Sequence, residues 1–130
     1  MARLIDTRHK IVTPARAVET ALDLRRRGTQ VTVVTGLFDV LQSEPVGRIA
    51  ALAGAGVLMV LVAEDPAAIV PLAARAELAA ALRGVDYVVP TANAPALAAQ
   101  MHPARVVDYS QEDRAARAAL IANVRRKHAK

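Results

Sequence analysis

A short turn between two expected elements holds the residues best suited to chemistry. Thr35, Gly36 and Asp39 lie in residues 35–41, which follow a β-branched run and precede an expected helix. Glycine permits a tight turn, and a helix that begins after such a turn offers free N–H groups and a positive dipole end to an anion. The turn is therefore a candidate phosphate site. The alternative is structural, with Asp39 as a turn or capping residue.

Strand and helix signals alternate on both sides of this turn. Thr13 and Pro14 suit a helix start, and Gly28 suits its stop. Such alternation is typical of βαβ units, so we expect one α/β domain over residues 1–130. Its predicted architecture is a Rossmann-like three-layer α/β/α sandwich with a parallel sheet. We expect helices at 14–27, 44–53, 73–83, 94–101 and 111–127, and strands at 31–35 (central), 57–62, 85–89 and 105–107.

Two further expectations concern the later elements. Pro90 is expected to end the third strand, after residues 85–89. The C-terminal helix is expected to pack inward through an apolar face. That face comprises Ala116, Leu120, Ile121 and Val124.

Several segments, in order, resemble one enzyme family. Residues 36–41, GLFDVL, resemble the G-x-F-D-x-L-H-x-G-H signature of the cytidylyltransferase-like nucleotidyltransferases. Residues 75–88 are similar to the R-A-E-x-L-A-A-L-x-x-V-D-Y-V block of the heptose-phosphate adenylyltransferase domain, and residues 102–109 are similar to its R-P-D…D-Y segment. The resemblance covers about residues 10–109 and implies the nucleotidyltransferase fold. It implies these nucleotide-binding candidates: Thr35, Gly36, Phe38, Asp39, Gln42, Asp65 and Arg75.

Some of these residues have structural alternatives. Arg75 matches a family arginine near the nucleotide phosphates, but it could instead form a surface ion pair with Glu77. Asp86 and Tyr87 are expected to fix a strand end and pack rather than contact a ligand.

The sequence departs from the family where the catalytic histidines belong. Gln42 and Pro45 occupy the two histidine positions, and Glu44 replaces the glycine between them. One lost charge-stabilising donor costs about 3 kcal/mol of transition-state stabilisation. Two such losses would slow the reaction on the order of ten-thousandfold. The family's lysine-containing loop is also absent, since no lysine lies between Lys10 and Lys127. We therefore assign no catalytic residue.

Three functions follow as hypotheses. The first is a degenerate, non-catalytic nucleotidyltransferase-fold protein that acts as a binding or interaction module. The second is an active nucleotidyltransferase that makes an activated sugar or alcohol from ATP or CTP, with Mg²⁺ if nucleotide binding is retained. The third is a basic nucleic-acid-binding domain, which rests on charge alone.

The composition and charge of the chain limit the classes of ligand and partner that we expect. The chain has 130 residues, a net charge of +5 and no cysteine, which excludes disulfides and thiolate metal sites. The first residues lack the apolar run of a signal peptide, and no segment has the roughly 18 apolar residues of a membrane span. His9, His102 and His128 have no metal-ligand spacing. We expect a cytoplasmic protein, a homodimer as in relatives, a nucleotide as the possible ligand, no membrane and no nucleic acid.

Overall fold

Four parallel strands form the middle layer of the protein, in the order β3-β2-β1-β4. The computed structural model describes residues 6–39, 49, 52, 54 and 56–128. The strands are β1 (Val31–Gly36), β2 (Val57–Ala63), β3 (Tyr87–Thr91) and β4 (Arg105–Asp108). β1 pairs in parallel with both β2 and β4, so it is an internal strand as predicted. The remaining elements are η1 (Arg8–Lys10), α1 (Pro14–Arg26), α3 (Leu72–Ala80), α4 (Ala94–Met101) and α5 (Ser110–His128).

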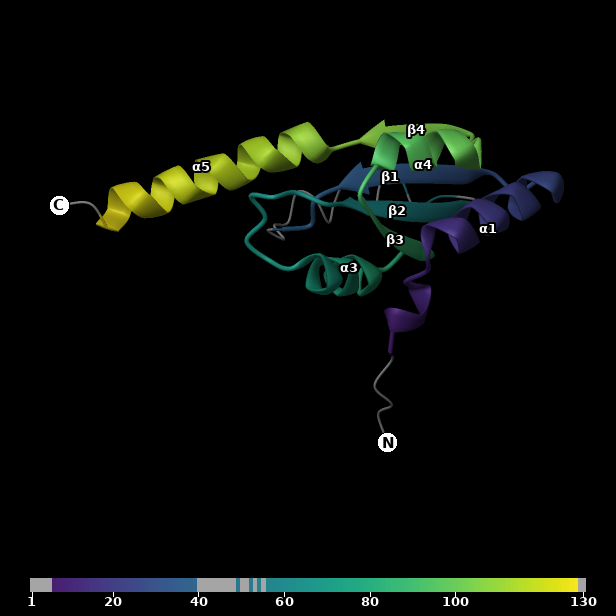
Figure 1. Cartoon of the computed structure of the whole chain (residues 1–130), viewed down its shortest axis with the longest axis horizontal. Coiled ribbons are helices and arrows are strands. Elements are labelled where there is room, and N and C mark those ends of the chain that lie inside the picture. The colour runs from purple at the N-terminus through teal and green to yellow at the C-terminus, as the bar shows by residue number, and fades with distance from the viewer. Residues whose placement is uncertain (1–5, 40–48, 50–51, 53, 55, 129–130) are drawn as a thin grey trace.

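Each face of the sheet carries its own apolar core. On one face, Val33 and Met59 of the strands pack with alanines of α1 and with α4. On the other face, Val34 and Val60 pack with alanines of α3 and with Ile49. Figure 1 shows the helices on both sides of the sheet. The predicted three-layer α/β/α sandwich is therefore confirmed.

Side-chain caps begin two of the predicted helices, and the first of these caps was predicted from the sequence. The Thr13 side chain accepts a hydrogen bond from the Arg16 N–H at 3.2 Å, with Pro14 at the first helical position of α1. Gly28, at a φ of 78°, follows the end of this helix. Asn93 caps α4 by accepting from the Ala96 N–H at 3.2 Å. The helix predicted at 44–53 lies mostly outside the described residues, within which positions 49 and 52 are helical.

The predicted bounds around β3 were wrong in two places. The helix predicted at 73–83 ends at Ala80, because the chain then turns to bury Val85, which is 2% exposed. The strand predicted at 85–89 runs instead from Tyr87 through Pro90 to Thr91. Val88 directs its carbonyl outward to the Val12 N–H, and residues two apart in a strand share a direction, so the nitrogen of Pro90 also faces outward. A proline is tolerated there because no ladder hydrogen bond is lost.

The two edges of the sheet differ. The outer side of β3 is partly covered, because Ile11 forms a parallel bridge with Val88 and Val12 donates to the Val88 carbonyl at 2.9 Å. Among the described residues, no strand pairs with the outer side of β4. Val106 in this strand is 53% exposed. The sheet therefore has one blunted edge and one open edge.

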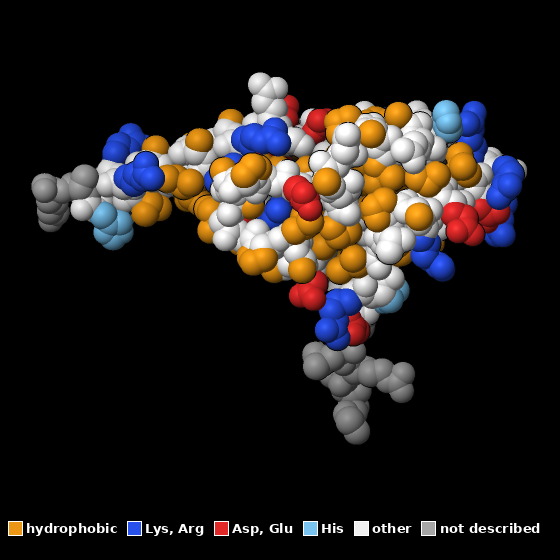
Figure 2. All heavy atoms as spheres, viewed as in Figure 1, with side chains coloured by type: hydrophobic (Ala, Val, Ile, Leu, Met, Phe, Trp, Pro, Cys, Tyr) orange, Lys and Arg blue, Asp and Glu red, His pale blue; other side chains and the backbone are white. Residues whose placement is uncertain are grey.

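The C-terminal helix does not pack as predicted. Of its residues only Ser110 and Arg117 are buried, while Ala116 and Val124 are exposed and Leu120 and Ile121 are half-buried. Figure 1 shows α5 running from the end of β4 away from the sheet. Among the described residues, neither apolar core includes a residue of the predicted apolar face. Basic side chains gather at the projecting end (Figure 2).

Candidate functional site

The carboxyl ends of β1 and β2 bring five of the predicted site residues together. Thr35 and Gly36 end β1, Asp39 follows it, and Asp65 follows β2. Arg75 reaches the same edge from the first turn of α3. Ligands in open parallel sheets bind outside this edge. Gln42 lies outside the described residues, together with Glu44 and Pro45.

Arg117 joins the two carboxylates. Its Nη1 donates to Oδ2 of Asp39 at 3.0 Å, and its Nη2 donates to Oδ2 of Asp65, also at 3.0 Å. The exposed fraction is 9% for the Arg117 side chain, 2% for Asp39 and 7% for Asp65. We call these three residues the Arg117 cluster. Arg114 adds a longer contact from its Nε to Asp65 at 3.4 Å, with its own side chain 51% exposed.

Backbone N–H groups complete the coordination of both carboxylates. Asp39 accepts from Ile69 N–H at 2.9 Å and from Val70 N–H at 2.7 Å. Asp65 accepts from Ala67 N–H at 2.9 Å. Asp39 therefore fastens the turn after β1 to the loop after β2, which is a structural role across the sheet rather than the local cap considered from the sequence.

These contacts shift the pKa values of the cluster. Burial is the largest single influence on Asp39 and would raise its pKa, but the hydrogen bonds from Ile69, Val70 and Arg117 together outweigh burial and hold the pKa below its ordinary value. The Ala67 N–H is the main cause of the lowered pKa of Asp65. Hydrogen bonding to Asp39 raises the pKa of Arg117. The cluster is therefore an ionised one, with two carboxylates around one buried guanidinium.

Arg75 supports the same edge from the interior. Its side chain is 2% exposed, and its Nε donates to the Val70 carbonyl at 2.9 Å. Its Nη1 donates to the carbonyls of Leu37 at 2.9 Å and Ala63 at 2.7 Å. The alternative of a surface ion pair with Glu77 is therefore wrong. Arg75 ties the ends of β1 and β2 to the loop that precedes α3.

Gly36 is needed for space rather than for an unusual backbone conformation. The positive φ in this turn belongs to Phe38, at 54°, and not to Gly36. A Cβ at Gly36 would lie 2.9 Å from Cε2 of Phe38 and 3.0 Å from Oδ2 of Asp113. The same Asp113 oxygen accepts from the Leu37 N–H at 3.0 Å. The first turn of α5 therefore lies against the turn that was predicted to receive phosphate.

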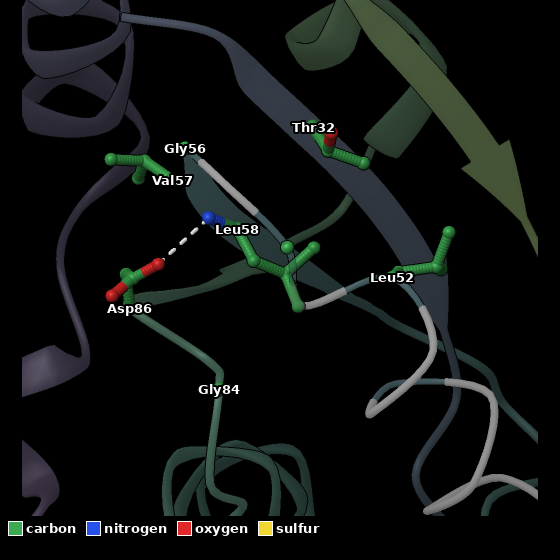
Figure 3. A pocket seen from close by; sticks show the side chains of 8 residues that line it. Thr32, Leu52, Gly56, Val57, Leu58, Gly84 and Asp86 are labelled. Atoms are coloured by element: carbon green, nitrogen blue, oxygen red, sulfur yellow. Dashed lines mark hydrogen bonds between the residues drawn. The ribbon is translucent and has the colours of Figure 1, made fainter.

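Asp86 lies at the opposite end of the sheet from this cluster. It accepts from the Leu58 N–H at 2.8 Å beside a small cavity of about 170 Å³, which Thr32 and Gly84 also line (Figure 3). The Asp86 N–H in turn donates to the Leu58 carbonyl at 3.0 Å. Asp86 thus fixes the strand end, as expected from the sequence. Tyr87 begins β3 and packs against a core.

Sequence reasoning missed Arg117 and Asp113. The contact from Arg117 to Asp39 spans 78 positions, and the one from Asp113 to the Leu37 N–H spans 76. The only local signal for Arg117 is an arginine flanked by two alanines on each side. In the described part of the chain, no group of three or more His, Cys, Asp or Glu side chains is placed to hold a metal ion.

Comparisons with known proteins do not show a family for this chain. No known family matches it, and no curated protein is significantly similar to it. Among the described residues, no helix is both long enough and apolar enough to cross a membrane. The chemistry of the site must therefore be argued from its own geometry.

Proposed function

We propose that this protein is a degenerate relative of the cytidylyltransferase-like nucleotidyltransferases, which does not transfer nucleotidyl groups and acts as a binding or interaction module. The observation that carries the proposal is that the charged residues of the predicted site, at the carboxyl ends of β1 and β2, are bound by other groups of the protein. Asp39 and Asp65 are bound by Arg117 and by backbone N–H groups, and Arg75 donates to three carbonyls. The charged groups that would meet a nucleotide hold the protein together instead.

The replaced histidine positions support the same conclusion. Gln42 can offer a neutral hydrogen bond, whereas Pro45 has no N–H at all, so neither can supply the positive charge that the family's reaction requires. Glu44 adds a negative charge where phosphates would approach.

The competing proposal is an active nucleotidyltransferase that uses substitute groups. It draws on the convergence of Asp39 and Asp65, since paired carboxylates can bind Mg²⁺ together with a nucleotide. An enzyme of this kind must bind its nucleotide, and a nucleotide at about 100 times its Kd would stabilise the native state by about 2.7 kcal/mol.

Thermal unfolding with ATP or CTP and Mg²⁺ tests the two proposals. We expect no stabilisation of the wild-type protein and no pyrophosphate release with a panel of sugar phosphates. The matched variant carries Gln42→His, Glu44→Gly and Pro45→His, and we expect it to gain nucleotide-dependent stabilisation. Stabilisation of the wild type that the triple variant loses would show that Glu44 and its neighbours form a working nucleotide site, and pyrophosphate release would then establish the active enzyme.

The homodimer implied by the resemblance stays a prediction. Light scattering on the same samples measures it directly. A mass of 13.7 kDa at high micromolar concentration would show a monomer and contradict the prediction.

A further inference from the structure

Among the described residues, polar side chains connect helix α5 to the domain. Asp113, Arg114 and Arg117 form side-chain hydrogen bonds to the carboxyl edge, all within two turns of the helix. No residue of α5 belongs to either apolar core among the described residues. Burial in this helix of 19 residues is confined to Ser110 and Arg117. Within the described residues, the side-chain contacts that hold α5 on the domain are therefore polar.

The charges of α5 are complementary to those of the edge. Asp113 and Arg117 are four residues apart, which places them on one face of the helix. Asp113 brings a carboxylate to the backbone N–H of Leu37, and Arg117 brings a cation between two carboxylates. The carboxyl edge thus has an N–H group that binds an anion, at Leu37, and a pair of aspartates that binds a cation.

The Arg117 guanidinium lies between carboxylate oxygens of the kind that bind divalent cations. Two carboxylate oxygens, one each from Asp39 and Asp65, lie 3.0 Å from two nitrogens of the same guanidinium. Mg²⁺ and Mn²⁺ are bound in proteins by such carboxylate oxygens. The Leu37 N–H, which now donates to Asp113, is a hydrogen-bond donor for an anionic ligand at the same edge.

We propose that α5 is an internal blocker of this edge, in which Arg117 takes the place of a divalent cation and Asp113 takes the place of an anionic ligand of that cation. The proposal rests on the proposed function and adds the regulation of the same site. A divalent cation with anionic oxygen ligands therefore competes with α5 for this edge, so that binding of either one disfavours binding of the other.

Hydrogen exchange on the full chain tests the attachment of α5. An isolated helix of this length is marginally stable in water, so release from the domain should expose its amides. We expect Arg117→Gln to accelerate exchange at residues 113–124 by about tenfold or more. The matched control is Arg114→Gln, which removes a half-exposed contact and should change the exchange by less than about twofold. Unchanged protection in Arg117→Gln would overturn the proposal.

Manganese binding tests whether Arg117 blocks a cation position. We expect about 5 mM Mn²⁺ to raise the Tm of Arg117→Gln, or to restore its folding if the variant is unfolded, because binding to the native state must stabilise it. The double variant Asp39→Asn with Arg117→Gln keeps charges balanced but lacks one carboxylate, and its Tm should not rise. Equal effects in the two variants, or an unfolded Arg117→Gln that Mn²⁺ does not restore, would contradict the proposal.

The two proposals fail separately. Nucleotidyl transfer by the wild type would end the module proposal and leave the exchange result standing. Unchanged exchange in Arg117→Gln would end the blocker proposal without any bearing on turnover.

Discussion

Replacing Arg75 by methionine removes a buried cation while keeping most of the volume of its stem. The guanidinium donates to the carbonyls of Val70, Leu37 and Ala63, at distances of 2.7 to 2.9 Å. Hydrogen bonds from charged groups are worth about 1.5–3 kcal/mol each, but the variant also recovers several kcal/mol that burying the guanidinium costs. We expect a net loss of about 3 kcal/mol in the free energy of unfolding.

Urea unfolding followed by far-ultraviolet circular dichroism measures this loss. For a domain of this size, about 3 kcal/mol corresponds to a Tm lower by about 12 °C. The matched control is Arg83→Met, since Arg83 is exposed and forms no hydrogen bond or ion pair with a described residue. The control should stay within about 0.5 kcal/mol of the wild type. A value for Arg75→Met within about 1 kcal/mol of the wild type would refute the claim that Arg75 ties the two strand ends together.

Two other perturbations follow from the same edge. Gly36→Ala should lower the free energy of unfolding by about 1–3 kcal/mol, because its Cβ meets Phe38 and Asp113. Gly54→Ala, with open space around its Cβ, should be nearly neutral in the same urea titration, and equal effects of the two would contradict this account. Lowering the pH should destabilise the protein below about pH 4, because Asp39 and Asp65 have folded pKa values below their unfolded ones, and their stabilisation is lost as they protonate. When both aspartates are replaced by asparagine, the free energy of unfolding measured by urea titration should depend less steeply on pH between about pH 2 and 7. An unchanged dependence on pH would contradict the stabilising role of the two carboxylates.

Elements with local signals were predictable from the sequence. The Thr13 cap and Gly28 bounded α1, and the β-branched run at 31–35 located the internal strand. These signals succeed because each depends on residues within one or two turns of itself. The same reasoning failed for α5, since an alanine-rich helix looks the same whether or not a core lies beneath it.

The site was predictable as a location but not as a set of contacts. Asp39, Asp65 and Arg75 do meet at one edge, because parallel strands end together. Which partner satisfies each charge depends on contacts across up to 78 positions, as between Arg117 and Asp39. No local sequence pattern indicates a contact between residues that lie so far apart in the chain. Gly36 shows the same limit, since its role depends on Asp113, a residue of the last helix.

The unequal edges of the sheet limit how copies of this protein could join through their backbones. A fibre of stacked sheets needs two free edges on every copy, so that each addition leaves another edge to extend. Here the bridge at Ile11 and the outward-facing Pro90 blunt the β3 side, and in the part of the chain that the structure describes β4 is the open side. Pairing of two copies through β4 uses the open edge of both. Edge-to-edge growth therefore terminates at two copies rather than propagating.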